Sequence, residues 1–229
     1  YYPQESASTE ADKKKYVQAK SFSLMERKDF GGSGDASDKV WIHSGCIINT
    51  MTLRAAMGEA VSVSLDAMAA TTTADTTSVS TNYPYTALSS ADVYNFSHAS
   101  VSYGGSPITN IIEAFDLTIG NNAELLYGLG SYTAKTGVWK ARDVTLTIDM
   151  TDEGTQFMDD LMGAADSISA PVKISSVVLT LTKSASIDMT ITLVNLKISD
   201  RDAGLDYGEV VKEKLTLEAE YVYCVENQA

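Results

Sequence analysis

The strongest constraint on the fold is a strict alternation of apolar and polar residues over residues 143–150. Successive side chains of a β-strand point to opposite faces of a sheet, so an alternating segment places one face on a core and the other in water. The segment therefore predicts a half-buried strand. Its apolar positions are Val144, Leu146, Ile148 and Met150, and its polar positions are Thr145, Thr147 and Asp149.

Further strands are predicted along most of the chain. Residues 61–66 alternate in the same way, which places Val61, Val63 and Leu65 on a core and leaves Ser62, Ser64 and Asp66 in water. Two long runs rich in β-branched residues, 172–183 and 187–199, predict a long hairpin. Shorter strand patterns occur at 22–24, 40–42, 47–53, 94–103, 114–119 and 211–224.

One segment has helical spacing instead. Thr151 is a suitable N-cap, and apolar residues recur every three to four positions from Phe157 to Met162, which predicts one helix over about 151–163. Residues 69–80, with the Tyr83-Pro84-Tyr85 that follows, predict a long loop. We therefore expect a mainly β fold, a β-sandwich or barrel with one flanking α-helix and long loops.

The N-terminal residues differ from the rest of the chain. They are polar, lack hydrophobic periodicity and end in Lys13-Lys14-Lys15, so we expect an extended arm over residues 1–16 and a single β domain over residues 17–229. The sequence starts at Tyr1 instead of a methionine, which indicates a processed chain or part of a longer one.

The charge balance excludes several classes of function. The chain has 30 acidic and 17 basic side chains, a formal net charge of -13, which repels phosphate and argues against tight nucleic-acid binding. No apolar run approaches the roughly 20 residues that a membrane-spanning helix needs, so no membrane insertion is expected. Cys46 and Cys224 could pair if their strands were neighbours, but we favour two free buried thiols.

Motifs for catalysis and for cofactor or metal binding are nearly absent. His43 and His98 have no nucleophile elbow nearby and are expected to be ordinary strand or loop residues, and no nucleotide-binding loop or zinc spacing is present, so we expect neither enzyme activity nor a cofactor. Residues 200–209 are rich in carboxylates, but their spacing does not match a calcium loop, and an acidic turn between strands is favoured. Asn95 lies in a short glycosylation pattern that matches often by chance.

The order of five segments resembles that of a known family. Residues 21–24, 44–53 with Gly45-Cys46, 58–63, 115–122 with Asn121-Asn122, and 142–148 follow one another as in the major tail tube proteins of long-tailed, siphovirus-like viruses of bacteria and archaea. The resemblance extends from about Val17 to the C-terminus, and members often carry a further N-terminal part.

The resemblance implies a structural virion protein without an active site. Its subunits would form homohexameric rings, and the rings would stack into the tail tube that conducts the viral genome. The expected partners are other copies of the chain and other tail proteins, namely the tape measure, the tail terminator and the baseplate or tip. DNA would pass through the lumen without specific binding, because a negative lumen repels phosphate.

Two surfaces of such a tube have candidate residues. Three polar strand faces compete for the lumen: Ser62, Ser64 and Asp66; Thr145, Thr147 and Asp149; and Thr190 with Thr192. For stacking between rings, the candidates are in the arm and the long loop, at Tyr1, Tyr2, Lys13, Lys14, Lys15, Tyr83 and Tyr85. The loop tyrosines, with Tyr94, could equally pin the loop onto the domain.

A second class of function fits the same composition. A secreted or surface β-sandwich that binds a glycan or a protein also has Thr/Ser-rich loops, exposed tyrosines and acidity. Such a module would remain monomeric at high concentration, whereas a tube subunit would self-associate without a ligand.

Overall fold

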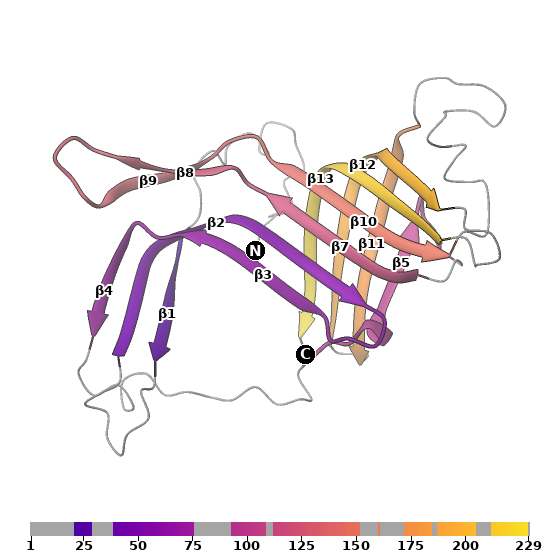
Figure 1. Cartoon of the computed structure of the whole chain (residues 1–229), viewed down its shortest axis with the longest axis horizontal. Helices are drawn as coiled ribbons and strands as arrows, with labels where there is room; N and C mark the ends of the chain where they lie inside the picture. Colours follow the sequence, from indigo (N-terminus) through magenta and orange to yellow (C-terminus); the bar gives the residue numbers. More distant parts are fainter. Residues whose placement is uncertain are drawn as a thin grey trace, which may run out of the picture.

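The computed structural model describes residues 21–28, 39–75, 93–108, 112–151, 160, 172–184, 187–204 and 212–228. Within these ranges the chain is almost entirely β-strand, which confirms that the fold is mainly β (Figure 1). In this part of the chain, one 3-10 turn, η2, occurs at Phe96–His98. The strands are β1 Phe22–Lys28, β2 Lys39–Ala56, β3 Ser62–Met68, β4 Thr71–Asp75, β5 Ala99–Tyr103, β6 Ser106–Pro107, β7 Ile112–Gly120, β8 Ala123–Tyr127, β9 Ala134–Trp139, β10 Asp143–Thr151, β11 Ile174–Ser184, β12 Ile187–Gly204 and β13 Lys212–Gln228.

Eleven of these strands form one antiparallel sheet. Its order is β1-β2-β7-β10-β13-β12-β11-β5-β6, and β3 and β4 both pair with β2. The sheet folds over on itself, so that β3, β2, β7 and β10 make one layer and β11 and β5 cross behind them (Figure 1). The predicted long hairpin is confirmed as β11 and β12.

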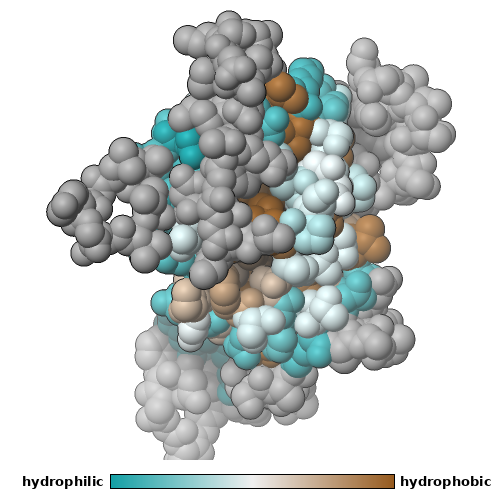
Figure 2. Space-filling model, turned by 90° about the vertical axis from the view of Figure 1, so that its right-hand side faces the viewer, coloured by the Kyte–Doolittle hydropathy of each residue, from teal (hydrophilic) through white to brown (hydrophobic). Residues whose placement is uncertain are grey.

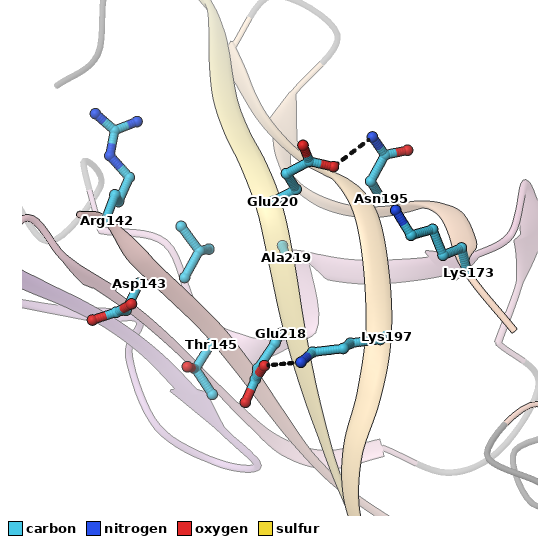
Figure 3. A pocket seen from close by; sticks show the side chains of 10 residues that line it. Arg142, Asp143, Thr145, Lys173, Asn195, Lys197, Glu218, Ala219 and Glu220 are labelled. Carbon is cyan, nitrogen blue, oxygen red and sulfur yellow. Dashed lines mark hydrogen bonds and ion pairs between the residues drawn. The ribbon is translucent and has the colours of Figure 1, made fainter. Parts of the chain in front are cut away.

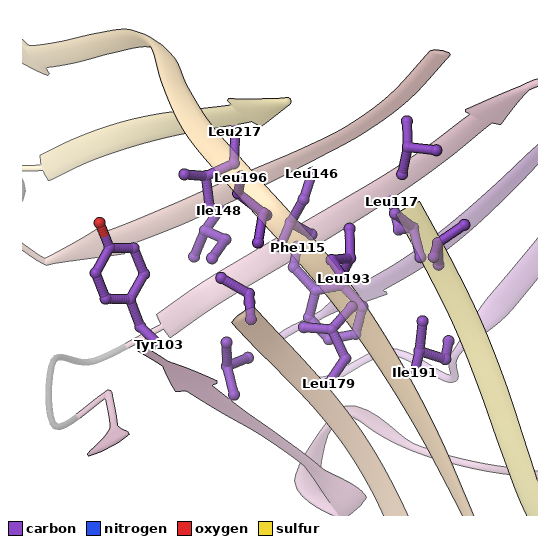
Figure 4. Close-up of a cluster of buried hydrophobic side chains, with 14 of the residues drawn as sticks. Tyr103, Phe115, Leu117, Leu146, Ile148, Leu179, Ile191, Leu193, Leu196 and Leu217 are labelled. Carbon is purple, nitrogen blue, oxygen red and sulfur yellow. The ribbon is translucent and has the colours of Figure 1, made fainter. Parts of the chain in front are cut away.

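The core lies between the two layers. Alternation places Leu146 and Ile148 of β10 on the same inner face as Phe115 of β7, and Leu179 and Leu193 meet them from the other layer (Figure 4). All five side chains are fully buried, as the sequence pattern of residues 143–150 predicts for β10.

β12 and β13 belong to both layers, because both strands change their inward-facing positions at one corner. On β12 the buried positions shift from Ile191 and Leu193 to Leu196 and Ile198. The shift occurs at Asn195, which has a φ of 55° and donates a hydrogen bond to Glu220 of β13 over 3.0 Å. Strands that turn from one layer into another commonly do so at such local irregularities.

β2 is one long strand, where the sequence predicts two short ones. It bends at Gly45, whose φ of +67° is a left-handed conformation that glycine adopts without strain. A side chain at this position would also clash with Ala70, because an added Cβ would lie 2.8 Å from the Ala70 Cβ. On the N-terminal side of the bend, β2 pairs with β1 on one side and β4 on the other. Residues 71–75 are therefore strand, and the predicted loop over 69–80 is wrong for that part.

Two further predictions are corrected around β10 and β5. The helix expected over 151–163 is not confirmed, since Thr151 is the last residue of β10 and, apart from Asp160, the remaining positions lie outside the described residues. The strand expected over 94–103 begins only at Ala99. Before it, the backbone N–H of Asn95 donates a hydrogen bond to the His98 ring over 3.0 Å, and Phe96–His98 form the η2 turn instead of strand.

The two cysteines are free, but only one of them is buried. Cys46 lies in β2 at the bend, and its thiol donates a weak hydrogen bond to the His43 carbonyl over 3.2 Å. Cys224 is exposed near the C-terminal end of β13, so the expectation of a second buried thiol is wrong.

Candidate assembly surfaces

β3 is an edge strand with an uncovered apolar face. Val63 and Leu65 are 55% and 53% exposed, although they pair with the core-facing residues Leu53 and Met51 of β2. The sequence therefore predicts the correct face of the sheet for both residues, but the predicted burial of their side chains is wrong. The reason is the extent of the second layer, which covers β2 and does not extend beneath β3.

The outer edge of β3 carries backbone groups that no other described strand pairs with. Pairing does begin just before the strand: the Val61 N–H donates to the Tyr94 carbonyl over 2.8 Å, and Ala60 and Asn95 form an isolated bridge. Over Ser62–Met68 this pairing stops, and the strand contains neither proline nor lysine. Such an exposed edge is a template for pairing with another chain.

The opposite edge of the sheet is protected. β6 has two residues, one of them Pro107, which cannot donate a hydrogen bond from its backbone nitrogen. The chain then folds back, and the Ile108 N–H donates to the Val101 carbonyl of β5 over 3.1 Å. This edge therefore offers little backbone to a further strand.

Two of the three candidate lumen sets lie on one surface. Ser64 of β3 pairs with Thr52 of β2, Thr52 with Thr118 of β7, and Thr118 with Thr145 of β10. Parallel rows run from Asp66 through Thr50 and Gly120 to Asp143, and from Ser62 through Arg54 and Asp116 to Thr147. Ser62, Ser64 and Asp66 therefore share one face with Thr145 and Thr147, and we call this face the polar face.

The third candidate set lies elsewhere. Thr190 and Thr192 alternate with the buried Ile191 and Leu193 of β12, so they face outward from the second layer. Thr192 is itself buried. The sequence pattern could not separate the two surfaces, because a polar strand face looks the same on either layer.

The polar face consists mainly of small hydroxyl side chains and is net acidic. Its three rows hold three aspartates and one arginine, and Arg54 contacts Asp116 at 3.5 Å. Asp66 accepts a hydrogen bond from the Asn49 amide over 3.0 Å. Beyond the rows, Lys197 of β12 contacts Glu218 of β13 at 2.8 Å, so that lysine is neutralised too.

A cavity of about 600 Å³ opens at the end of the polar face, where β10 and β13 separate at the corner (Figure 3). Basic and acidic side chains alternate around it, and two contacts connect its walls, Lys197 with Glu218 and Asn195 with Glu220. Because the charges of both signs are mixed, the cavity favours neither a phosphate nor a cation. The cavity results from the separation of β10 and β13 at the corner.

The surface on the right-hand side of Figure 1 shows no large apolar patch among its described residues. Viewed from the right-hand side of Figure 1, hydrophobic residues appear as small separate groups among hydrophilic and neutral ones (Figure 2). Scattered apolar residues of this kind are normal for a protein surface.

The remaining sequence candidates are placed as follows. Tyr1, Tyr2, Lys13, Lys14, Lys15, Tyr83 and Tyr85 lie outside the described residues. Asp200 and Asp202 belong to β12 instead of an acidic turn, and residues 205–211 lie outside the described residues. Between the two aspartates, the buried Arg201 forms hydrogen bonds with the buried Glu213.

The histidines lie in ordinary strand and turn positions. His43 of β2 hydrogen-bonds Thr72 of β4 over 2.9 Å, and its other ring nitrogen lies 3.8 Å from Glu26 of β1. Among the residues that the structure describes, no group of three or more His, Cys, Asp or Glu side chains could hold a metal ion. In the same residues, no helix has the length and hydropathy needed to cross a membrane.

Comparison with known proteins gives the chain a family. The profile of the family described as phage tail tube protein matches residues 7–213. No curated protein matches the chain. A chain in the cryo-EM structure of the anti-feeding prophage (AFP) baseplate, 6-fold symmetrised, is similar at 17% sequence identity and a TM-score of 0.36, over 56% of this chain and 90% of that chain. Because the family profile covers most of its length, the chain belongs to the phage tail tube protein family and is a component of the virion tail.

Proposed function

We propose that this chain forms homohexameric rings that stack into the tail tube and conduct the viral genome. The observation that carries the proposal is the outer edge of β3, seven residues long and unprotected, on a chain of the tail tube family. In a ring, this edge would add to the sheet of the neighbouring subunit, so that six open sheets close into one continuous barrel.

Strand addition would stabilise the ring through two contributions. New backbone hydrogen bonds along Ser62–Met68 contribute about 1 kcal/mol each. Covering the exposed parts of Val63 and Leu65 adds about 2 kcal/mol per contact. Since a closed ring repeats each contact around its circumference, moderate contacts are enough for a stable assembly.

The polar face is the proposed lumen surface. The opposite face of the same layer is occupied by the core, so a barrel closed through β3 presents the polar face to one side along its whole circumference. Short hydroxyl side chains leave room for DNA, and the aspartates repel its phosphates. The lumen would therefore conduct DNA without binding it specifically, and this role requires no catalytic residue.

Other tail proteins are the further partners that we propose. The tape measure would occupy the lumen before ejection, and the terminator and the baseplate or tip would contact the end rings. Residues 1–16 and the loop tyrosines remain our sequence-based candidates for contacts between stacked rings. Deleting residues 1–16 should then leave folded subunits that stack poorly, and tubes of unchanged length would contradict a role for this arm.

Electron microscopy of the purified, concentrated protein tests the proposal. We expect rings or hollow tubes to form without any partner, in a concentration-dependent manner. A population that remains monomeric at every concentration would contradict the tube and favour the alternative, a monomeric binding module.

A variant separates specific assembly from aggregation. Replacing Val63 and Leu65 by lysine places charges on the β3 edge and should abolish rings while the subunit stays folded. The matched control is Ser100→Lys on β5, which lies near the protected edge and should leave assembly unchanged. Loss of rings in both variants would contradict the assignment of the β3 edge.

A further inference from the structure

We propose that carboxylates on the polar face screen its basic side chains from DNA phosphates one by one, and that Asp116 and Glu218 are positioning residues in this screening. The inference rests on the proposed function, because DNA meets this face only if it lines the lumen. The effect depends on which side chains lie next to each other. It is therefore distinct from the general repulsion of phosphate by a net negative charge.

The rows of the polar face continue from β10 onto β13 and β12, because Thr145 pairs with Glu218 and Glu218 pairs with Lys197. The outward-facing positions of β13 alternate with the buried Leu215 and Leu217. Over β3, β2, β7, β10, β13 and β12, the described residues of this face include four basic side chains. They are Arg54 of β2, Lys197 of β12, and Lys212 and Lys214 of β13.

Each of these four basic side chains lies beside a carboxylate of another strand. Three pairs are in contact, and Figure 3 shows the second of them: Arg54 with Asp116 at 3.5 Å, Lys197 with Glu218 at 2.8 Å, and Lys212 with Glu113 at 2.8 Å. The fourth side chain, Lys214, has Asp149 and Asp202 as its register partners on the two neighbouring strands. Opposite charges at such cross-strand positions attract each other.

The exposure of the paired side chains shows which partner a ligand could reach. The Arg54 side chain is 54% exposed and that of Asp116 33%. The carboxylate is also the less exposed partner in the Lys197–Glu218 and Lys212–Glu113 pairs. The basic groups therefore stay accessible, and they would bind a phosphate if the carboxylates were absent, arginine through two parallel hydrogen bonds.

Stability alone does not explain why every basic side chain has such a partner. Ion pairs between exposed side chains stabilise a fold only weakly. The carboxylates of the face, in contrast, also lie beside neutral groups: Asp66 accepts a hydrogen bond from the Asn49 amide, and Asp143 accepts one from the Asn122 amide. The pairing is therefore a property of the basic side chains, and it removes the groups that would hold DNA.

Symmetry would amplify the effect of a single unscreened basic group. In a ring of identical subunits, that group recurs in every subunit at the same height, and it recurs again in each stacked ring. Weak phosphate contacts repeated along one DNA molecule add up to strong binding. Screening each basic group separately would therefore keep the lumen from holding the genome.

Two variants of equal net charge test the screening. Asp116→Asn with Glu218→Gln removes two screening carboxylates, and Asp66→Asn with Asp200→Asn removes two others from the same face, so each variant raises the net charge of -13 by two. Binding of a short fluorescein-labelled DNA duplex is measured by anisotropy at low ionic strength. We expect the first variant to bind about tenfold more tightly than the second, because it gains two phosphate contacts.

A reversal variant and the controls complete this experiment. Adding Arg54→Gln and Lys197→Gln to the first variant restores the net charge of the wild type and should return DNA binding to the wild-type level. Circular dichroism checks that each variant is folded. Equal binding by the two charge-matched variants, or no binding by either, would overturn the screening, and so would tight binding that persists in the reversal variant.

A second measurement follows Arg54 directly and uses a single substitution. The Nε–H signal of Arg54, assigned with Arg54→Gln, is recorded by NMR during a titration with inorganic phosphate, at a protein concentration below that of assembly. We expect a saturable shift in Asp116→Asn and a much smaller one in the wild type and in Asp66→Asn. Equal shifts in the three proteins would overturn the screening.

The outcomes separate this proposal from the proposed function. Tubes that form while the two charge-matched variants bind DNA equally would leave the tube intact and overturn the screening. Tighter DNA binding by Asp116→Asn with Glu218→Gln, in a protein that never forms rings, would support the screening pairs and contradict the tube alone.

Discussion

Two edge strands of the main sheet, β3 and β6, differ in length, composition and protection. β3 presents seven residues with exposed Val63 and Leu65, whereas β6 presents Ser106 and Pro107 and the chain then folds back over β5. Natural β proteins normally blunt both edges to prevent aggregation. Of these two edges, β3 is therefore the one suited to pairing with another subunit.

The difference also affects how the subunit is stabilised. Near the protected edge, the Tyr103 hydroxyl donates a hydrogen bond to Asp160 over 2.7 Å, and the Gly104 N–H donates to the Ser176 carbonyl over 2.9 Å. At β3 the only strand partner among the described residues is β2. Changes at β3 should therefore affect assembly, and changes elsewhere should affect the stability of the subunit.

The largest effect is expected from charges on the open edge. Val63→Lys with Leu65→Lys should reduce ring formation by more than about tenfold, because the apolar contact is lost and each contact would have to bury two charged side chains. Sedimentation of the protein over a range of concentrations measures the assembly. Circular dichroism should report an unfolding temperature within a few degrees of the wild type, and a large decrease would mean that β3 stabilises the subunit itself.

A large loss of stability is expected from breaking the buried ion pair. Glu213→Ala removes the Glu213 carboxylate from the buried Arg201 guanidinium, which should lower the free energy of unfolding by about 3–5 kcal/mol. Urea denaturation measures the change. At low denaturant, the amount of assembled variant should decrease only in proportion to the loss of folded protein. An unfolding midpoint equal to that of the wild type would show that the Arg201–Glu213 pair contributes little to stability.

A smaller effect is expected at the protected edge from Tyr103→Phe. The substitution removes the hydroxyl that bonds Asp160 and should lower the free energy of unfolding by about 1–2 kcal/mol at neutral pH. Burial, and then the contact with Asp160, raise the pKa of Tyr103 above its ordinary value. The folded state therefore retains this proton when the unfolded chain loses it.

The sign of the pH effect follows from this raised pKa. The stabilisation is complete below about pH 10 and is lost as the pH rises further, so the wild type should lose stability more steeply than Tyr103→Phe in alkaline solution. Urea midpoints between pH 8 and pH 11 measure both slopes. Equal slopes for the two proteins would contradict the assignment of the bond.

The smallest effect is expected from removing the proline of β6. Pro107→Ala restores a backbone donor at an exposed position and should change the free energy of unfolding by less than about 0.5 kcal/mol. It should also increase non-specific association slightly, which light scattering detects. An assembly defect as large as that of the β3 lysine variant would contradict the functional difference between the edges.

The sequence predicts strands best where alternation and burial agree. The pattern of β10 gives its inner and outer faces correctly, because neighbours on both sides and a second layer cover it. The same pattern in β3 gives the correct face and the wrong burial, since the extent of the opposite layer is a tertiary property. The sequence predicts separate strands at 40–42 and 47–53, whereas the fold has one strand that bends at Gly45 through its positive φ.

The candidate surfaces could be predicted only in part. The hydroxyl-rich faces of β3 and β10 are visible in the sequence, but only the pairing through β2 and β7 shows that they form one surface. The β8–β9 hairpin is absent from the sequence predictions, because its glycine-rich, uncharged segment lacks alternation.

Hydrogen–deuterium exchange of assembled and dissociated protein tests the central claim most directly. On assembly, we predict slower exchange for the amides of Ser62–Met68 that face away from β2, while exchange at Ala99–Pro107 stays the same. Assembled rings in which Ser62–Met68 exchange as fast as in the free subunit would contradict the account.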